Sequence, residues 1–284
     1  MDAEHLILPQ NEHLILPQTK QLLSSLAQKY EVAAFTQEDP SQFLRWYSSP
    51  ADIESACFIA SMLSFGSRKQ FIPKIRSIFQ LADNDGGMAN WLKSGRFRKD
   101  FERSERKFYR FYSYADMVDL FAALGKVLST HSTLGEAVHE FCDSRTSDDT
   151  FAVPVATRNS VAGTVQSSVL GSTLDFFRIN FSQVSIVPKG KTSANKRLFM
   201  YLRWMVRQNS PVDLGLWTWF PQSELIIPLD VHVLQEAKRL GLIPAGAPAS
   251  FKTAQMLTAS LKQIWPEDPC KGDFALFGVG VDEG

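Results

Sequence analysis

Apolar residues recur three and four positions apart along most of this chain, which is the spacing of one buried face of an α-helix. This pattern predicts ten helices, with first residues close to Gln21, Ala51, Gln70, Tyr114, Ser132, Thr173, Ser193, Asp230, Phe251 and Asp268. Runs in which apolar and polar residues alternate, as in a half-buried strand, are nearly absent. We therefore predict an all-α fold.

One polar stretch interrupts the helical pattern. "DSRTSDDT" occupies residues 143–150, and a passage rich in serine, threonine and glycine follows it as far as Ser168. Such a composition is typical of a loop or linker. Residues 143–168 are therefore the one candidate for an internal boundary, and we expect residues 19–284 to form a single helical unit of two lobes.

The N-terminus carries a short duplication. "EHLILPQ" occurs at residues 4–10 and again at residues 12–18. Two copies of seven residues are too short to be units of a repeat architecture. We interpret residues 1–18 as a duplicated N-terminal arm.

Composition describes an ordinary globular protein. Of 284 residues, 44% are hydrophobic and 21% charged, and 30 basic side chains balance 30 acidic ones, so whole-chain charge indicates no polyanionic partner. The three cysteines, Cys57, Cys142 and Cys270, are odd in number and far apart, which favours a reducing compartment over a disulfide framework. No apolar run approaches the roughly 18 residues of a membrane helix, and the N-terminus lacks the basic and apolar regions of a signal peptide. We expect a soluble, cytoplasmic protein with no membrane partner.

The positive charge is unevenly distributed. Residues 176–212 contain no aspartate or glutamate but seven lysines and arginines, a local charge of +7. Such an acid-free segment is typical of a surface that contacts phosphates. The alternative is a solvated basic face that pairs with acidic neighbours elsewhere in the fold, which is what most charge runs are.

The same segment contains a predicted helix for which Ser193 is a suitable N-cap. Helical spacing collects cations on one face of it and leucines on another. Just upstream, "PKGK" at residues 188–191 places two lysines around a glycine, before a helix N-terminus whose free N–H groups favour an anion. The candidate nucleic-acid contacts are Lys189, Lys191, Arg197, Arg203, Arg207 and, from a later segment, His232.

That later segment is "IIPLDVHV", residues 226–233, in which an apolar run ends at Pro228 and a helical pattern begins at once. Asp230 is a preferred N-cap residue, and Gly241 is a typical helix stop. Local chemistry therefore predicts Asp230 as a helix cap. A carboxylate at this position, close to His232, is also a candidate catalytic group.

Several segments together resemble a bacterial family of proteins of unknown function. They are "SANKRLFMYLRWMVR", "VDLGLW", "IIPLDVHV" and "DFALFGVGV", in that order, preceded by "ADIESACFIASMLSFGSRKQFI" and "RKFYRFYSYADM". The resemblance covers the chain from about residue 20 onward. It implies membership but no particular chemistry.

A more distant resemblance implies a fold and a function. "PLDVHV" followed by a helix is similar to the Pro-Val-Asp-Val-His segment of the helix-hairpin-helix DNA glycosylases, particularly the 8-oxoguanine type. In those two-lobed helical enzymes a lysine opens the helix after the hairpin and attacks C1′ of the damaged nucleotide, forming a Schiff base. An aspartate that caps a later helix activates the lysine and stabilises positive charge on the sugar. By position, the resemblance implies that Lys196 is this lysine and Asp230 this aspartate.

The sequence departs from the glycosylase pattern around both residues. "VPKGKTSANK" has one glycine where the hairpin usually reads Leu-Pro-Gly-x-Gly, and the lysine and aspartate are 34 residues apart, which is longer than usual. Asp213, in a Pro-Val-Asp string 17 residues after Lys196, is an alternative to Asp230. We prefer Asp230 because a regular helical pattern follows it, whereas Asp213 leads into Gly215 and two tryptophans.

We therefore expect a DNA-binding protein, with excision of a damaged base from a duplex as the hypothesis to test. Enzyme status stays open, because a non-catalytic nucleic-acid-binding protein on the same scaffold, or a protein-interaction module with a basic face, would share these features. No cofactor is expected. A zinc site from His139 and Cys142 would need two further ligands, and three cysteines cannot supply the four of an iron–sulfur centre.

Overall fold

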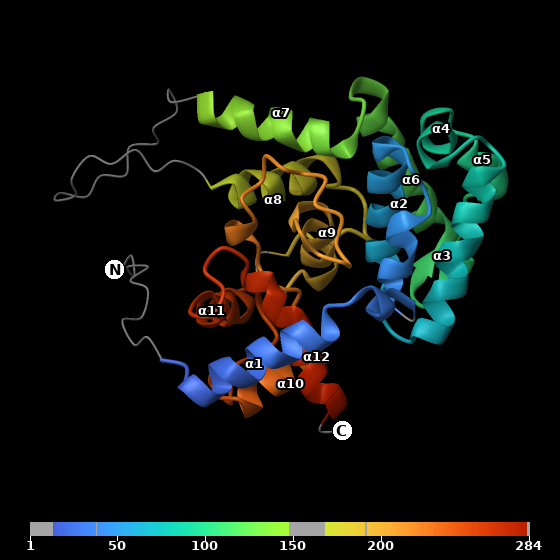
Figure 1. The fold of residues 1–284 in the computed structure, drawn as a ribbon. Helices are drawn as coiled ribbons and strands as arrows, with labels where there is room; N and C mark the ends of the chain where they lie inside the picture. Colours follow the sequence, from blue (N-terminus) through green and yellow to red (C-terminus); the bar gives the residue numbers. More distant parts are fainter. Residues whose placement is uncertain (1–13, 38, 148–167, 191, 283–284) are drawn as a thin grey trace, which may run out of the picture.

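Twelve α-helices and one short β-hairpin form the part of the chain that the computed structural model describes, residues 14–37, 39–147, 168–190 and 192–282 (Figure 1). The helices are α1 (Pro17–Tyr30), α2 (Pro50–Leu63), α3 (Arg68–Asp83), α4 (Met88–Lys93), α5 (Phe97–Asp100), α6 (Tyr114–Thr130), α7 (Leu134–Ser147), α8 (Val169–Asn180), α9 (Lys196–Val206), α10 (Val231–Arg239), α11 (Phe251–Lys262) and α12 (Gly272–Asp282). The hairpin pairs β1 (Lys107–Tyr109) with antiparallel β2 (Tyr112–Ser113). Short 3-10 turns are η1 (Ala33–Gln37), η2 (Pro40–Arg45), η3 (Gln222–Glu224) and η4 (Pro269–Lys271). The described chain is mostly helical, which confirms the all-α class.

Each helix predicted from the apolar spacing has a counterpart whose first residue lies within four positions of the predicted one. The largest change at a helix end is in α7, which continues to Ser147 through the polar residues that were expected to end it. Residues 148–167, the greater part of the predicted boundary, lie outside the described residues.

The apolar spacing does not predict α4, α5 or the hairpin. The two helices are six and four residues long, too short to display a helical period. Their aromatic residues Trp91 and Phe97 pack on Phe121 of α6, with ring centroids 4.9 and 5.6 Å apart. Tertiary packing therefore defines these elements, as it does for most short helices.

Polar caps fix where several longer helices begin. The Ser49 side chain accepts the Asp52 N–H at the start of α2, and Ser113 and Asp116 form a reciprocal capping box at the start of α6. Ser250 caps α11 in the same way as Ser49 caps α2. Each such cap contributes about 1 kcal/mol to the stability of its helix.

Two groups of helices meet at α9. In the first, α2 contacts α3, α4, α7 and α9, α6 packs on α4, and α7 packs on α8. In the second, α1 packs along α12, and α12 also contacts α10. Figure 1 shows α9 between the two groups. Their buried apolar residues belong to one hydrophobic core that runs from Ile15 to Val279, and this shared core fixes the starts of α9, α10 and α12 relative to one another.

Part of the duplicated arm is docked on this body. Ile15 is buried, and its N–H donates to Gln263 Oε1 at 3.1 Å. Pro17 begins α1, at a position where proline is favoured. The last two residues of the arm predicted over 1–18 are therefore helical, and residues 1–13 lie outside the described part.

The three cysteines are free thiols within the core. Burial raises the pKa of Cys57, Cys142 and Cys270, which disfavours the reactive thiolate. Among the described residues, no helix combines the length and the apolar character that a membrane crossing requires.

Candidate active site

A cleft of about 490 Å³ lies where the starts of α9 and α10 meet α12 and the turn between α2 and α3. Its polar and charged lining residues are Asp39, Ser64, Arg68, Lys196, Arg203, Asp230, His232, Glu236 and Asp273. Its aromatic lining residues are Phe35, Phe65, Phe71, Phe274 and Phe277. A cleft of this size and mixed lining is large enough to hold a small organic molecule.

Lys196 and Asp230 meet at this cleft. Lys196 is the first residue of α9, and Asp230 is the N-cap of α10, where its side chain accepts the Val233 N–H at 2.9 Å. The predicted capping role of Asp230 is confirmed. Lys196 Nζ lies 3.1 Å from Asp230 Oδ2, and the two side chains are 35% and 30% exposed. The pair implied by the resemblance is thus in direct contact and accessible from the cleft.

The residue before Lys196 determines where α9 begins. Asn195 has a left-handed backbone (φ 47°, ψ 33°), which asparagine tolerates better than most residues. Its Nδ2 donates to Gly190 O at 2.8 Å, which closes the loop ahead of the helix. The prediction of Ser193 as the N-cap is wrong, because the loop continues to Asn195 and Ser193 instead forms an isolated β-bridge with Ser250.

Opposing effects act on the Asp230 carboxyl. Burial alone would raise its pKa, but the Lys196 ammonium and the Val233 N–H favour the ionised form, and together they hold the pKa below its usual range. His232, exposed on the cleft, acts in the same direction. Asp230 is therefore a carboxylate at neutral pH, suited to stabilising positive charge rather than to taking up a proton.

Another aspartate of the cleft, Asp273, was not among the residues predicted from the sequence. Asp273, in the first turn of α12, binds Arg203 Nη1 through Oδ2. Burial raises the pKa of Asp273 to about 6, against the lowering effect of Arg203, and the charge of Asp230 adds to the increase. No local motif distinguishes this aspartate from any other near a helix start, so only the fold places it in the site.

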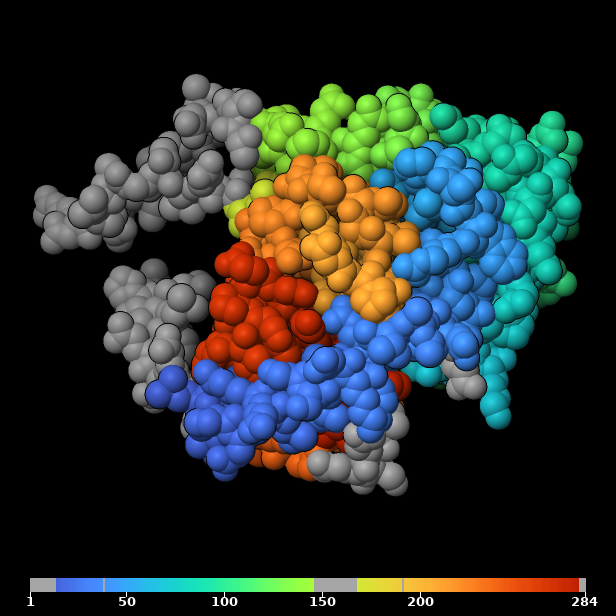
Figure 2. Space-filling view, viewed as in Figure 1, coloured from blue at the N-terminus to red at the C-terminus, as the bar shows by residue number. Residues whose placement is uncertain are grey.

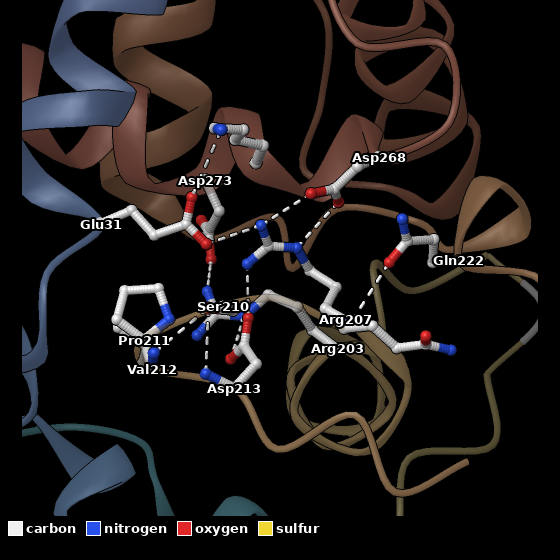
Figure 3. Close-up of polar contacts among 12 residues, drawn as sticks. Glu31, Arg203, Arg207, Ser210, Pro211, Val212, Asp213, Gln222, Asp268 and Asp273 are labelled. Carbon is white, nitrogen blue, oxygen red and sulfur yellow. Dashed lines mark hydrogen bonds and ion pairs between the residues drawn. The ribbon is translucent and has the colours of Figure 1, made fainter. Parts of the chain in front are cut away.

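Two further arginines, Arg203 of α9 and Arg207 just after it, are buried in a network of carboxylates, whose contacts Figure 3 shows. The Arg207 side chain is 2% exposed. Its guanidinium contacts Asp268 through Nε and Nη2, both at 2.8 Å, Asp213 through Nη1 at 2.5 Å, and Glu31 through Nη2 at 2.8 Å. Arg203, whose side chain is 5% exposed, binds the other Asp213 oxygen through Nε at 3.3 Å. These contacts tie α1, α9 and the segment before α12 into one ionic network.

The prediction that Arg203 and Arg207 lie on an exposed face is therefore wrong. The alternative, pairing with acidic neighbours from elsewhere in the fold, describes both arginines, although the pairs are buried rather than solvated. Asp213, the alternative to Asp230, has a fully buried side chain with one oxygen bound to each arginine. Its carboxylate therefore has no exposed oxygen with which to contact a substrate.

Lys189 also serves the fold. Its Nζ donates to Phe181 O at 3.0 Å and to Val184 O, just after the end of α8. Burial lowers the pKa of Lys189. Two of its three donors are thus committed to the main chain, which leaves little for a phosphate.

The other three residues predicted to contact nucleic acid are Arg197, His232 and Lys191. Arg197 Nη1 donates to Met62 O at 2.6 Å, and the guanidinium lies 5.0 Å from the centre of the Phe65 ring, so this arginine packs against the turn that borders the cleft. His232 is exposed on the cleft itself. Lys191 lies outside the described residues.

Within the described residues, no group of three or more histidine, cysteine, aspartate or glutamate side chains has the arrangement of a metal site. His139 stacks on Trp219, with centroids 4.4 Å apart and planes 9° from parallel. Cys142 Sγ lies 3.6 Å from Thr173 Oγ1. The two residues considered for zinc thus have other partners.

Residues 39–282 match a protein family described as "Protein of unknown function (DUF2400)". Because the match covers well over half of the chain, the protein belongs to this family, in agreement with the resemblance to a family of unknown function. No curated protein and no solved structure matches the chain. The resemblance to the helix-hairpin-helix glycosylases stays a prediction.

Proposed function

We propose that this DUF2400 protein binds DNA and excises a damaged base, with Lys196 as the amine nucleophile and Asp230 as the carboxylate that assists it. One observation carries the proposal: a lysine at a helix start and an aspartate at a second helix start, 34 residues apart, are 3.1 Å from each other on a cleft large enough to admit a nucleobase. The glycosylase resemblance pairs the same two residues. Nothing in the local sequence around either residue requires this contact.

The chemistry assigns a separate role to each side chain. Once its ammonium has passed a proton to solvent water, the Lys196 amine forms a bond from Nζ to C1′ while the bond from C1′ to the base breaks. The base leaves with the electron pair and takes up a proton from water. The bond from C1′ to O4′ then breaks, O4′ keeps its electron pair and takes up one proton from Nζ, and the product is a protonated imine between Nζ and C1′. Asp230, ionised and adjacent, stabilises the positive charge that develops on the sugar.

The aromatic lining suits the substrate as well. Phe35 packs edge-to-face on Phe274 and Phe277, with ring centroids 5.2 and 4.9 Å apart, so the rings form a fixed wall of the cleft. A base extruded from the duplex gains about 1–3 kcal/mol by stacking on such a wall. The wall therefore offsets part of the cost of extrusion.

Borohydride trapping tests the proposal. The protein is incubated with duplexes that carry 8-oxoguanine, uracil or an abasic site, and sodium borohydride then reduces any imine to a stable covalent adduct. We expect an adduct with the wild-type protein that is lost in Lys196→Gln and retained in Lys252→Gln, an exposed lysine of α11. Base release without an adduct, abolished by Asp230→Asn, would instead indicate a monofunctional enzyme.

A second candidate is a non-catalytic DNA-binding protein on the same scaffold. The ion pair between Lys196 and Asp230 favours this candidate. The two charges neutralise each other, so the pair can serve a purely structural purpose, which is to hold the start of α9 against the start of α10. Salt-dependent DNA binding with neither an adduct nor base release on any of the three duplexes would support this candidate and refute the enzymatic one.

A further inference from the structure

A second basic segment lies outside the acid-free one. Residues 68–110 contain twelve lysines and arginines against five acids, a local charge of +7. Eleven of these twelve basic residues are exposed, and Lys74 is half-buried. In Figure 2 the segment covers the right-hand edge of the molecule. Unlike the buried Arg203 and Arg207, these residues present their charges to solvent.

Six of these cations belong to α3, whose first turn lines the cleft, or to the hairpin region that packs on it, and we call them the basic flank. They are Arg68, Lys69 and Lys74 of α3 and Arg106, Lys107 and Arg110 of the hairpin region. The hairpin is attached to α3, since Lys74 Nζ lies 4.9 Å above the centre of the Phe108 ring. A Cβ added to Gly66, in the turn before α3, would lie 2.8 Å from Arg110 Nη1. Gly66 and Arg68 both line the cleft, so the flank is continuous with it.

Most of the flank's cations form no direct ion pair with a described acidic side chain. Of the six, only Arg68 is within 4 Å of a described carboxylate, Asp39 at 3.6 Å, and Lys107 interacts with Asp116 at longer range. Arg106 stacks on the Tyr114 ring at 4.3 Å, a contact that leaves its charge uncompensated. The flank therefore keeps a net positive charge beside the cleft.

Arg110 occupies an unfavourable backbone conformation at the hairpin turn. Its φ is 51°, in the left-handed region that glycine adopts at lower cost. The turn thus holds an arginine where a glycine would be less strained, which is a pattern found at functional positions.

We infer that the basic flank is the docking surface for the phosphate backbone of duplex DNA, which it holds beside the cleft; the inference rests on the proposed function for its choice of polyanion. The flank has the character of a phosphate surface rather than a protein interface. Among the described residues between 68 and 113, Phe111 is the one exposed large hydrophobic, whereas a protein interface needs a buried apolar centre. The helix and hairpin also hold the cations on a fixed frame, as registration of a duplex requires.

The test measures binding of an undamaged fluorescent duplex over a series of KCl concentrations. Lys69→Gln combined with Lys107→Gln removes two flank charges. The matched control is Lys252→Gln combined with Lys262→Gln, two exposed lysines of α11, on the side of the molecule away from α3 (Figure 1). If each flank lysine meets one phosphate, the slope of log K against log salt falls by about 1.8, and affinity at 0.1 M salt falls on the order of tenfold per lysine. The control should keep the wild-type slope and affinity.

The outcomes separate this inference from the proposed function. If the flank variant binds duplex with the same salt dependence and affinity as the control, the inference about the basic flank is wrong, and the proposed chemistry in the cleft is unaffected. A wild-type protein that binds no duplex overturns both. Binding to vesicles containing phosphatidylserine, without binding to duplex, assigns the flank to a membrane and also overturns the inference. Melting temperatures of both double variants are measured alongside, and because all four lysines are exposed, they should match the wild type.

Discussion

Replacing Arg207 by methionine isolates the contribution of the buried ionic network. The methionine retains an apolar stem in the same space but removes the guanidinium that binds Asp268, Asp213 and Glu31. Removing one partner of a buried ion pair leaves an uncompensated charge and costs about 3–5 kcal/mol. Two of the three carboxylates keep another cation, since Arg203 still binds Asp213 and Lys271 lies 3.9 Å from Glu31.

We therefore expect a loss near the lower limit, about 3 kcal/mol in the free energy of unfolding. This corresponds to a decrease in melting temperature of roughly 6–12 °C for a chain of this size. The loss should be smaller at pH 5 than at pH 7. Carboxylates stranded in the folded protein have a raised pKa, so the folded state takes up protons there and regains stability as the pH falls.

The assay is urea unfolding followed by far-UV circular dichroism at both pH values. Arg103→Met is the matched control, because Arg103 also holds an aspartate, Asp119, through two nitrogens, but with 60% of its side chain exposed. An exposed pair contributes little, so the control should unfold at the wild-type urea concentration. If Arg207→Met unfolds together with the control, the network makes no net contribution and the reasoning fails.

Three further substitutions test other features. Asp230→Ala should lower the free energy of unfolding by about 1 kcal/mol through loss of the α10 cap, whereas Asp230→Asn keeps a capping side chain and should unfold like the wild type; equal losses in urea titrations would contradict the capping role. The pKa of Asp273 is raised to about 6 from 3.8, so its protonation contributes stability that is complete below about pH 4 and lost as the pH rises through about 6. Asp273→Asn should remove this part of the pH dependence, and an unchanged profile of urea midpoints between pH 4 and 7 would refute it. Gly135→Ala should destabilise the fold by about 1–3 kcal/mol, because its Cβ would lie 2.3 Å from Trp217 Nε1; a melting temperature equal to that of the wild type would exclude this clash.

The extent to which the fold can be predicted depends on how local its determinants are. α10 is predicted almost to the residue because Asp230 and Gly241 provide its start and stop within the segment itself. The start of α9 is misplaced because it depends on the left-handed backbone of Asn195, which a contact with Gly190 holds. The bounds of α10 thus follow from residues within the segment, whereas the start of α9 depends on the conformation of the loop before it.

The role of a charged residue is harder to predict from the sequence than a helix, because its oppositely charged partners can lie far away in the chain. Arg207 pairs with Asp268, 61 residues later, and with Glu31, 176 residues earlier. A window of sequence cannot contain these partners, so an acid-free segment looks like a free basic surface. The contact between Lys196 and Asp230 was expected from a family resemblance alone, because 34 residues of intervening chain give no physical reason for them to meet.

The position of two cations on α9 explains how the cleft is assembled. Lys196 and Arg203 are seven residues apart, so they lie on the same helix face about 10 Å apart along its axis. The first binds Asp230 at the start of α10, and the second binds Asp273 at the start of α12. One face of α9 thus sets the spacing of two carboxylates that belong to different helices. A change at Arg203 should therefore disturb the Asp273 side of the cleft while the contact between Lys196 and Asp230 persists, because α10 keeps its own cap and its own apolar contacts with the core.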